Sequence, residues 1–173
     1  MTARLWVDAS VARKPATLRE LTTMAKERGV RVAVHAHVHL ELCRHLRTKL
    51  RATYSPSVIR TYLEQQAVDI EAMTLDLVTA ERWAERLAER YETLDSWENA
   101  KLSTLGGALR RDFVNEPGRM PMTTDWWVAL MVEDNPEDRV AVDDQGGEWQ
   151  TLRASGRALT ADQTKEWLST LHP

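Results

Sequence analysis

Cysteine is almost absent from the sequence, because Cys43 is the only one among 173 residues. A single thiol excludes an intrachain disulfide, a redox pair of cysteines and a zinc site built from four cysteines. We interpret Cys43 as a small apolar residue of the core, which is the usual role of a free cysteine.

Long apolar runs are absent as well. No stretch approaches the ~20 apolar residues that a membrane-spanning helix needs. Residues 1–8 also lack the charged segment and the following long apolar segment of a signal peptide. We therefore expect a soluble, cytoplasmic protein with no membrane partner.

Neither charge predominates, since 23 Lys and Arg residues stand against 26 Asp and Glu residues and the formal net charge is −3. This balance does not have the strong positive excess of a general nucleic-acid-binding protein. A site for a polyanion would therefore have to be a local basic patch.

The length of 173 residues and the hydrophobic content of 43% suit one domain with one core. We predict a single domain over residues 1–173, with a helical insertion or extension at about residues 92–122. A capping box formed by Thr160 and Gln163 predicts a C-terminal helix at about residues 161–171.

Two short apolar segments, residues 4–7 and 30–34, have the composition of buried strands. Between them we predict a loop over residues 11–16 and then a helix, which opens with a capping box at residues 17–20 and ends at Gly29. Strand, helix and strand in so short a span form a parallel βαβ unit with a right-handed crossover.

The rest of the chain continues this alternation. Helices are predicted from about Ala36, from Pro56, after a cap at Asp76 and over residues 123–135. Short strands are predicted at residues 72–75, 139–142 and 157–159. The sequence therefore predicts an α/β fold with a parallel sheet.

Four acids are placed where this fold would bring them together. Asp8 and Asp143 directly follow apolar strands, and ligands of open parallel sheets bind at the carboxyl ends of the strands. Glu41 lies in an early turn of the helix after the second strand, and Asp125 lies in the first turn of a late helix. Because both helix starts face the same edge, we expect the four carboxylates to meet.

Carboxylates repel one another, so a cluster is tolerated mainly when a divalent cation neutralises it. Oxygen ligands suit Mg²⁺ or Mn²⁺. The chemistry that fits such a site is the metal-assisted hydrolysis of a phosphodiester, in which the ion activates a water and neutralises charge on the phosphate.

The residues resemble the PIN-domain nucleases, and most of all the VapC-type toxins. The matching features are Asp8-Ala9-Ser10 after a strand, Glu41-Leu42 with Arg44, Thr124-Asp125-Trp126 with Ala129, and Asp143-Asp144 at a strand end. The resemblance covers about residues 4–150.

The resemblance implies a three-layer α/β/α fold with a central parallel sheet of four or five strands, and an endoribonuclease that uses Mg²⁺ or Mn²⁺. Matched by position, the acidic quartet would be Asp8, Glu41, Asp125 and Asp143. Ser10 would correspond to the hydroxyl that often follows the first acid.

The sequence departs from the family in three respects, two of which are a segment at residues 92–122 that is longer than in compact toxins and a chain that exceeds their usual length. The third lies near the last acid. Many relatives have a threonine shortly before the last acid, where this chain has Ala141 and Val142. Asp144 is an alternative to Asp143 as the metal ligand, since both follow the same strand.

Candidate substrate contacts flank the acids. Arg44 and Arg47, with Lys49 and Arg51, lie on the helix that carries Glu41 and would contact RNA phosphates without reading the sequence. Trp126 and Trp149 would flank the acidic cleft, where one ring could stack on a base.

Three alternating histidines, His35, His37 and His39, look like transition-metal ligands on a strand. On a helix from Ala36, however, His37, Glu41 and His45 share a face. We therefore favour His37 or His45 as a residue that hydrogen-bonds near Glu41 or contacts substrate.

The partners implied by the resemblance are an RNA substrate, an antitoxin protein and a second copy in a homodimer. Two other functions compete with the nuclease. One is a PIN-like scaffold that binds RNA or a protein without catalysis. The other is a phosphoryl-transfer enzyme with Asp8 as nucleophile, although such enzymes carry a second Asp where this chain has Ser10.

Overall fold

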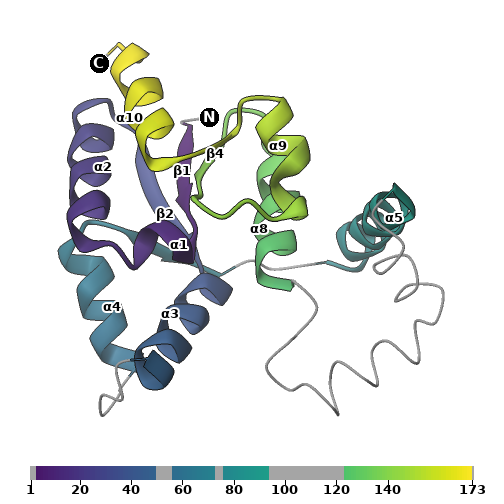
Figure 1. Cartoon of the computed structure of the whole chain (residues 1–173), viewed down its shortest axis with the longest axis horizontal. Helices are drawn as coiled ribbons and strands as arrows, with labels where there is room; N and C mark the ends of the chain where they lie inside the picture. Colours follow the sequence, from purple (N-terminus) through teal and green to yellow (C-terminus); the bar gives the residue numbers. More distant parts are fainter. Residues whose placement is uncertain (1–2, 50–55, 73–75, 94–122, 173) are drawn as a thin grey trace. The chain divides into compact units, whose positions relative to one another are not determined.

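The computed structural model describes residues 3–49, 56–72, 76–93 and 123–172, and the structural statements below refer to those residues (Figure 1). The chain divides into two compact units, residues 1–73 with 124–173 and residues 74–123. The first unit contains the sheet and all of the candidate site residues.

The sheet has five strands in the order β3-β2-β1-β4-β5, and every neighbouring pair is parallel. The strands are β1 (Arg4–Val7), β2 (Arg31–His35), β3 (Asp69–Glu71), β4 (Arg139–Ala141) and β5 (Ala158–Leu159). Central β1 pairs through Leu5 with Val32 on one side and with Arg139 on the other. Leu5, Val34 and Val140 are fully buried, as strands covered on both faces should be.

Helices cover both faces of this sheet, and the order of the strands explains why. The chain first moves outward from β1 through β2 to β3, and then returns across β1 to β4 and β5. Because crossovers are right-handed, the two directions place their helices on opposite faces. Figure 1 shows α2 on one side of the strands, and α8 and α9 on the other.

The helices of this unit are α1 (Ala9–Ala12), α2 (Pro15–Glu27), α3 (Ala36–Lys49), α4 (Pro56–Gln65), α8 (Thr123–Asp134), α9 (Gln150–Ala154) and α10 (Ala161–Thr170). The C-terminal α10 packs on α2. The predicted α/β fold with three layers and a parallel sheet is therefore confirmed. Among the described residues, no helix is both long and apolar enough to cross a membrane.

Several predicted elements appear at their expected places. β2, α3 and α4 begin within one residue of the predicted starts, and α8 ends just before Asn135. The capping box of α10 is present, since Thr160 Oγ1 accepts from Gln163 N at 3.3 Å and Gln163 Oε1 accepts from Thr160 N at 2.9 Å.

The segment between β1 and β2 differs from the prediction. The expected loop over residues 11–16 contains the end of α1, which Asp8 caps, and the start of α2. The proposed capping box at residues 17–20 was wrong, because α2 already begins at Pro15. Proline is well suited to the first helical position, since its fixed φ angle is already helical and it has no N–H to leave unpaired.

The short strand predicted at residues 72–75 lies, from residue 73 on, outside the described residues, and the third strand of the sheet, β3, lies at Asp69–Glu71, where none was predicted. This edge strand is polar rather than apolar, and ion pairs hold it in register. Arg31 contacts Asp69 at 2.7 Å and Glu71 at 3.1 Å, and Arg4 contacts Glu71 at 2.8 Å. A search for apolar runs therefore could not find it.

The second unit is represented by α5 (Leu77–Thr93). As predicted, Asp76 caps this helix, and its Oδ1 accepts a hydrogen bond from Thr79 N at 2.8 Å. The predicted insertion at residues 92–122 lies outside the described residues, apart from its first two positions at the end of α5.

Candidate metal centre

The strand order reverses between β1 and β4, and the candidate site lies at the carboxyl ends of these two strands. Such a switch point is where ligands bind in open α/β sheets, because the helices diverge there and leave room. Asp8 follows β1 directly, and its backbone N–H donates to Ala141 O of β4 at 3.0 Å. The two strand ends are thereby fixed side by side.

Asp8 is the most buried acid of the site, with 4% of its surface exposed. Its Oδ2 accepts a hydrogen bond from Ser10 N at 2.8 Å and so caps α1. Its Oδ1 is buried and has no hydrogen-bond partner. A buried carboxylate oxygen without a partner is costly. A divalent cation that prefers oxygen ligands would offset this cost, so Asp8 Oδ1 is suited to be a metal ligand.

Glu41 and Asp125 complete a first group with Asp8. One carboxylate oxygen from each of the three residues lies within 4.8 Å of the others. α3 starts directly after β2 and carries Glu41 in its second turn, and α8 carries Asp125 in its first turn. Residues from a strand end and from two helix starts therefore meet, as the sequence predicted for these three acids.

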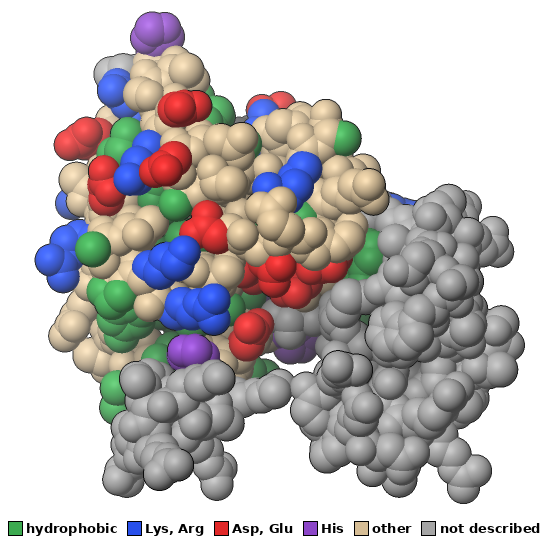
Figure 2. Space-filling model, viewed as in Figure 1, with side chains coloured by type: hydrophobic (Ala, Val, Ile, Leu, Met, Phe, Trp, Pro, Cys, Tyr) green, Lys and Arg blue, Asp and Glu red, His purple; other side chains and the backbone are tan. Residues whose placement is uncertain are grey.

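A second group joins Asp125 to Asp144 and Glu148, whose carboxylate oxygens also lie within 4.8 Å of one another. Asp144 is exposed, and its Oδ1 accepts from Gly146 N at 3.1 Å. Glu148 lies in the short 3-10 helix η1 (Gly147–Trp149) and is only 4% exposed. Figure 2 shows a patch of Asp and Glu side chains beside α8.

Gly146 makes room for the Glu148 carboxylate. A Cβ atom at position 146 would lie 1.7 Å from Glu148 Oε1 and 2.4 Å from Glu148 Cδ. The φ angle of Gly146 is −56°, which any residue can adopt. Glycine at this position therefore leaves space for the Glu148 side chain, which folds back over the loop, and an added Cβ would have to move that carboxylate.

The mutual repulsion of the acids appears in their pKa values. Burial is the main cause that raises the pKa of Asp125 to about 8, and repulsion by the carboxylates of Asp8, Glu148, Glu41 and Asp144 contributes the rest. Burial also raises the pKa of Glu148, and Asp144 adds to this effect. Without a cation, Asp125 therefore holds a proton at neutral pH.

Asp143, the predicted fourth acid, lies outside both groups. Its Oδ2 accepts from Lys14 Nζ at 2.7 Å, and its Oδ1 accepts from Ala161 N at 3.1 Å. Burial raises the pKa of Asp143, but these hydrogen bonds and the attraction of Lys14 outweigh it and hold the pKa below its ordinary value. Asp143 thus joins β4 to α2 and α10, and the alternative, Asp144, reaches the acidic cluster.

Ser10 and Arg153 position the loop that carries Asp143 and Asp144. Ser10 Oγ accepts a hydrogen bond from Asp143 N at 3.1 Å. Arg153, from α9, donates to Val142 O at 3.4 Å and also to Asp144 O. The Ser10 hydroxyl therefore supports the site by holding the backbone N–H of Asp143, in addition to any contact that it makes with substrate.

The sequence did not predict Glu148. It follows the double glycine at residues 146–147, which is typical of a turn, and no apolar run precedes it as one precedes Asp8. The available signals were the adjacent Trp149, which is fully buried, and the glycines that permit close approach. Neither signal identifies a ligand before the loop is folded.

The predicted aromatic and histidine contacts are rearranged. Trp126 is 4% exposed and Trp149 is fully buried, so neither presents its ring to solvent. Trp127 is half-buried, and its ring centroid lies 6.3 Å from that of the exposed His37. Trp127 and His37 are therefore the more accessible aromatic pair.

His35 is a core residue with 3% exposure, and its Nδ1 accepts from His37 N at 3.2 Å. Burial, followed by repulsion from His37, lowers the pKa of His35 to about 4, so the ring is neutral at pH 7. In the described part of the chain, neither group with metal-ligand geometry includes a histidine.

The other predicted substrate contacts lie on α3. The backbone of this helix carries Arg44, His45 and Arg47, and His45 is half-buried. The side chains of Arg44 and Arg47 lie outside the described residues. Their contact with RNA phosphates stays a prediction.

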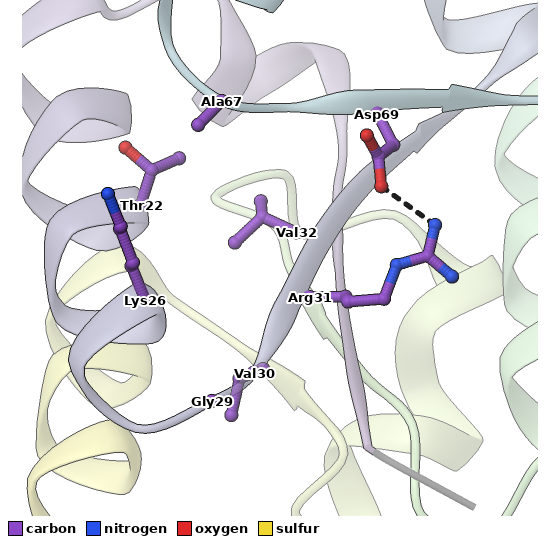
Figure 3. Close-up of a pocket in the computed structure, with 8 residues that line it drawn as sticks. All are labelled: Thr22, Lys26, Gly29, Val30, Arg31, Val32, Ala67 and Asp69. Atoms are coloured by element: carbon purple, nitrogen blue, oxygen red, sulfur yellow. Dashed lines mark hydrogen bonds and ion pairs between the residues drawn. The ribbon is translucent and has the colours of Figure 1, made fainter.

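A separate cavity of about 260 Å³ lies away from the acids. Figure 3 shows Thr22 and Lys26 of α2 facing Val32 of β2, with Arg31 hydrogen-bonded to Asp69 at 2.7 Å. Arg31 and Asp69 begin their strands. The cavity therefore lies at the amino-terminal ends of β2 and β3, whereas the candidate metal centre lies at the carboxyl ends of the strands.

The fold and the site together define an α/β protein with a carboxylate cluster at the switch point of a parallel sheet. In comparisons with known proteins, the sequence matches no family model and no curated protein. The function must therefore be argued from the site.

Proposed function

We propose that the protein is a metal-dependent nuclease that hydrolyses phosphodiester bonds in RNA, with Mg²⁺ or Mn²⁺ held by Asp8, Glu41 and Asp125. The observation that carries the proposal is the buried Asp8 Oδ1, which has no hydrogen-bond partner and lies beside two further carboxylates at the switch point. The resemblance of the sequence to PIN-domain nucleases supports the same assignment.

The three residues fit a hard divalent cation. All their ligand atoms are carboxylate oxygens, which Mg²⁺ and Mn²⁺ prefer over imidazole and thiolate. Asp8 is held in a fixed orientation by Ser10 N at 2.8 Å. The raised pKa of Asp125, about 8, means that repulsion is relieved either by a proton or by a cation.

Each residue has a role in this proposal. Asp8 is the fixed ligand, because its second oxygen already caps α1. Asp125 and Glu41 add negative charge from α8 and α3. A bound cation supplies an activated water and neutralises charge on the phosphate and the leaving oxygen. Asp125 releases its proton when the cation binds.

RNA is the proposed substrate for two reasons. The resemblance points to ribonucleases, and the exposed His37 lies near Trp127 on α8, two residues after Asp125. An aromatic pair beside a phosphodiester site can stack on an unpaired base without reading its identity. An antitoxin partner and a homodimer remain predictions of the same resemblance.

The experiment is cleavage of a labelled single-stranded RNA by the full chain at saturating Mn²⁺. We expect cleavage that stops with a chelator and falls roughly 100-fold or more in Asp8→Asn and in Asp125→Asn, because even residues that only support metal ligands are often worth 10-fold to 100-fold. Glu166→Gln, an exposed acid on α10, is the control and should cleave like the parent.

Circular dichroism of each variant separates loss of the site from loss of the fold. Parental rates in folded Asp8→Asn and Asp125→Asn would contradict the proposal. The absence of cleavage by the parent on RNA of varied sequence would contradict the substrate assignment.

A further inference from the structure

Asp125 belongs to both acidic groups, which otherwise share no residue. We infer that Asp125 bridges two divalent cations, and that the second cation is bound by Asp144 and Glu148. The inference rests on the proposed function, because the first cation is the one held by Asp8, Glu41 and Asp125.

Glu148 provides the observation that goes beyond a cluster of acids. Only 4% of the surface of Glu148 is exposed, and its Oε2 has no hydrogen-bond partner. Its oxygens nevertheless lie within 4.8 Å of those of Asp125 and Asp144. A buried carboxylate oxygen without a partner is costly, and a divalent cation shared with Asp125 and Asp144 would compensate for it.

The loop is built to keep Glu148 in this position. Gly146 leaves the space into which the carboxylate folds, since a Cβ there would lie 1.7 Å from Glu148 Oε1. The ring of Trp149, the next residue, is fully buried and anchors η1. Arg153 holds the backbone carbonyl of Asp144 from α9. Glu148 and Asp144 are thereby presented to the same point.

Asp143 does not compete for this second cation. Lys14 and Ala161 N occupy its two carboxylate oxygens at 2.7 and 3.1 Å. The two adjacent acids of the loop therefore have different roles. Asp143 ties the strand end to α2 and α10, whereas Asp144 remains available as a ligand.

Two cations that share one carboxylate suit phosphodiester chemistry. In such sites the ions lie on the two sides of the scissile phosphate, and each neutralises one of the attacking and leaving oxygens. In this chain Asp8 and Glu41 would serve one ion, and Asp144 and Glu148 the other. Asp125, from the first turn of α8, would fix the spacing between them.

The test is the number of Mn²⁺ ions bound per chain at pH 8.5, measured by calorimetry and by electron paramagnetic resonance. We expect two ions in the parent, with a spectrum of two magnetically coupled ions. Glu148→Gln should bind one ion and give the spectrum of isolated Mn²⁺. Glu166→Gln, the matched surface control, should bind two.

Gly146→Ala tests the same site without changing an acid. The added methyl group should displace the Glu148 carboxylate, so we expect one ion and the uncoupled spectrum, with the fold checked by circular dichroism. One ion in the parent, or two coupled ions in Glu148→Gln, would overturn the inference.

The stoichiometry separates this inference from the proposed function. Two coupled ions in a parent that cleaves no RNA would support the second site and contradict the nuclease. RNA cleavage by a parent that binds one ion would support the nuclease and contradict the second site.

Discussion

The proton on Asp125 should compete with the cation, and this competition can be predicted in magnitude. The pKa of Asp125 is raised from 3.8 to about 8 by burial and by the surrounding carboxylates. At pH 7 roughly nine in ten of these carboxyls carry a proton, and at pH 9 roughly one in ten do. A cation must displace that proton in order to bind.

The affinity for Mg²⁺ should therefore rise about 10-fold for each pH unit between 6 and 8, and level off above pH 8. Calorimetry in two buffers with different ionisation enthalpies measures the proton release directly. We expect about 0.9 protons released by Asp125 when it takes up cation at pH 7, and about 0.1 at pH 9. Glu148, whose pKa is also raised, adds to the release in the same direction.

An affinity that stays constant between pH 6 and 8, with no proton released at pH 7, would contradict this prediction. Such a result would mean that Asp125 is ionised without the cation, and that the acids do not repel one another as the geometry indicates. Glu166→Gln, an exposed residue that belongs to neither acidic group, should follow the parental curve and controls for general effects of pH on the protein.

Three further predictions concern stability. In a chelating buffer, Asp125→Asn should raise Tm by several degrees at pH 9 and change it little at pH 4. The reason is that the raised pKa of Asp125 gives stability that is present below pH 4 and lost as pH rises through about 8. An equal Tm difference at both pH values would contradict this prediction. Asp138→Ala should lower the free energy of unfolding in urea by about 3 kcal/mol, because the buried Asp138 Oδ2 accepts from Trp6 Nε1 at 2.8 Å and the indole N–H would lose its partner. In a Trp6→Phe background the same substitution should cost less, and equal costs in both backgrounds would exclude this hydrogen bond as the cause. Ala67→Gly should add about 1 kcal/mol to the free energy of unfolding, since Ala67 has φ +56° and glycine adopts the left-handed region without penalty. A loss of stability would show that the backbone at Ala67 is not strained.

The sequence predicted the parts of the site that follow from regular structure. Asp8 ends an apolar strand, and Glu41 and Asp125 lie near helix starts that a right-handed parallel fold brings to the same edge. These three acids do come together. Their positions depend on the periods of strands and helices, which can be read along the chain.

The remaining parts depend on contacts between distant residues. Asp143 is drawn away by Lys14, 129 positions earlier in the chain. Glu148 reaches the cluster because a loop bends at Gly146, and no periodic pattern encodes that bend. The polar strand β3 is held by ion pairs with Arg4 and Arg31 rather than by apolar burial. Such features become visible only when the chain is folded.

The most direct test of the metal centre is a crystal of the full chain soaked in Mn²⁺ at pH 8.5 and measured for anomalous scattering. We expect a peak at ~2.2 Å from oxygens of Asp8, Glu41 and Asp125. A second peak should lie against Asp144 and Glu148. Bound Mn²⁺ elsewhere in the crystal, with no peak among Asp8, Glu41 and Asp125, would show that these three acids are not a metal centre.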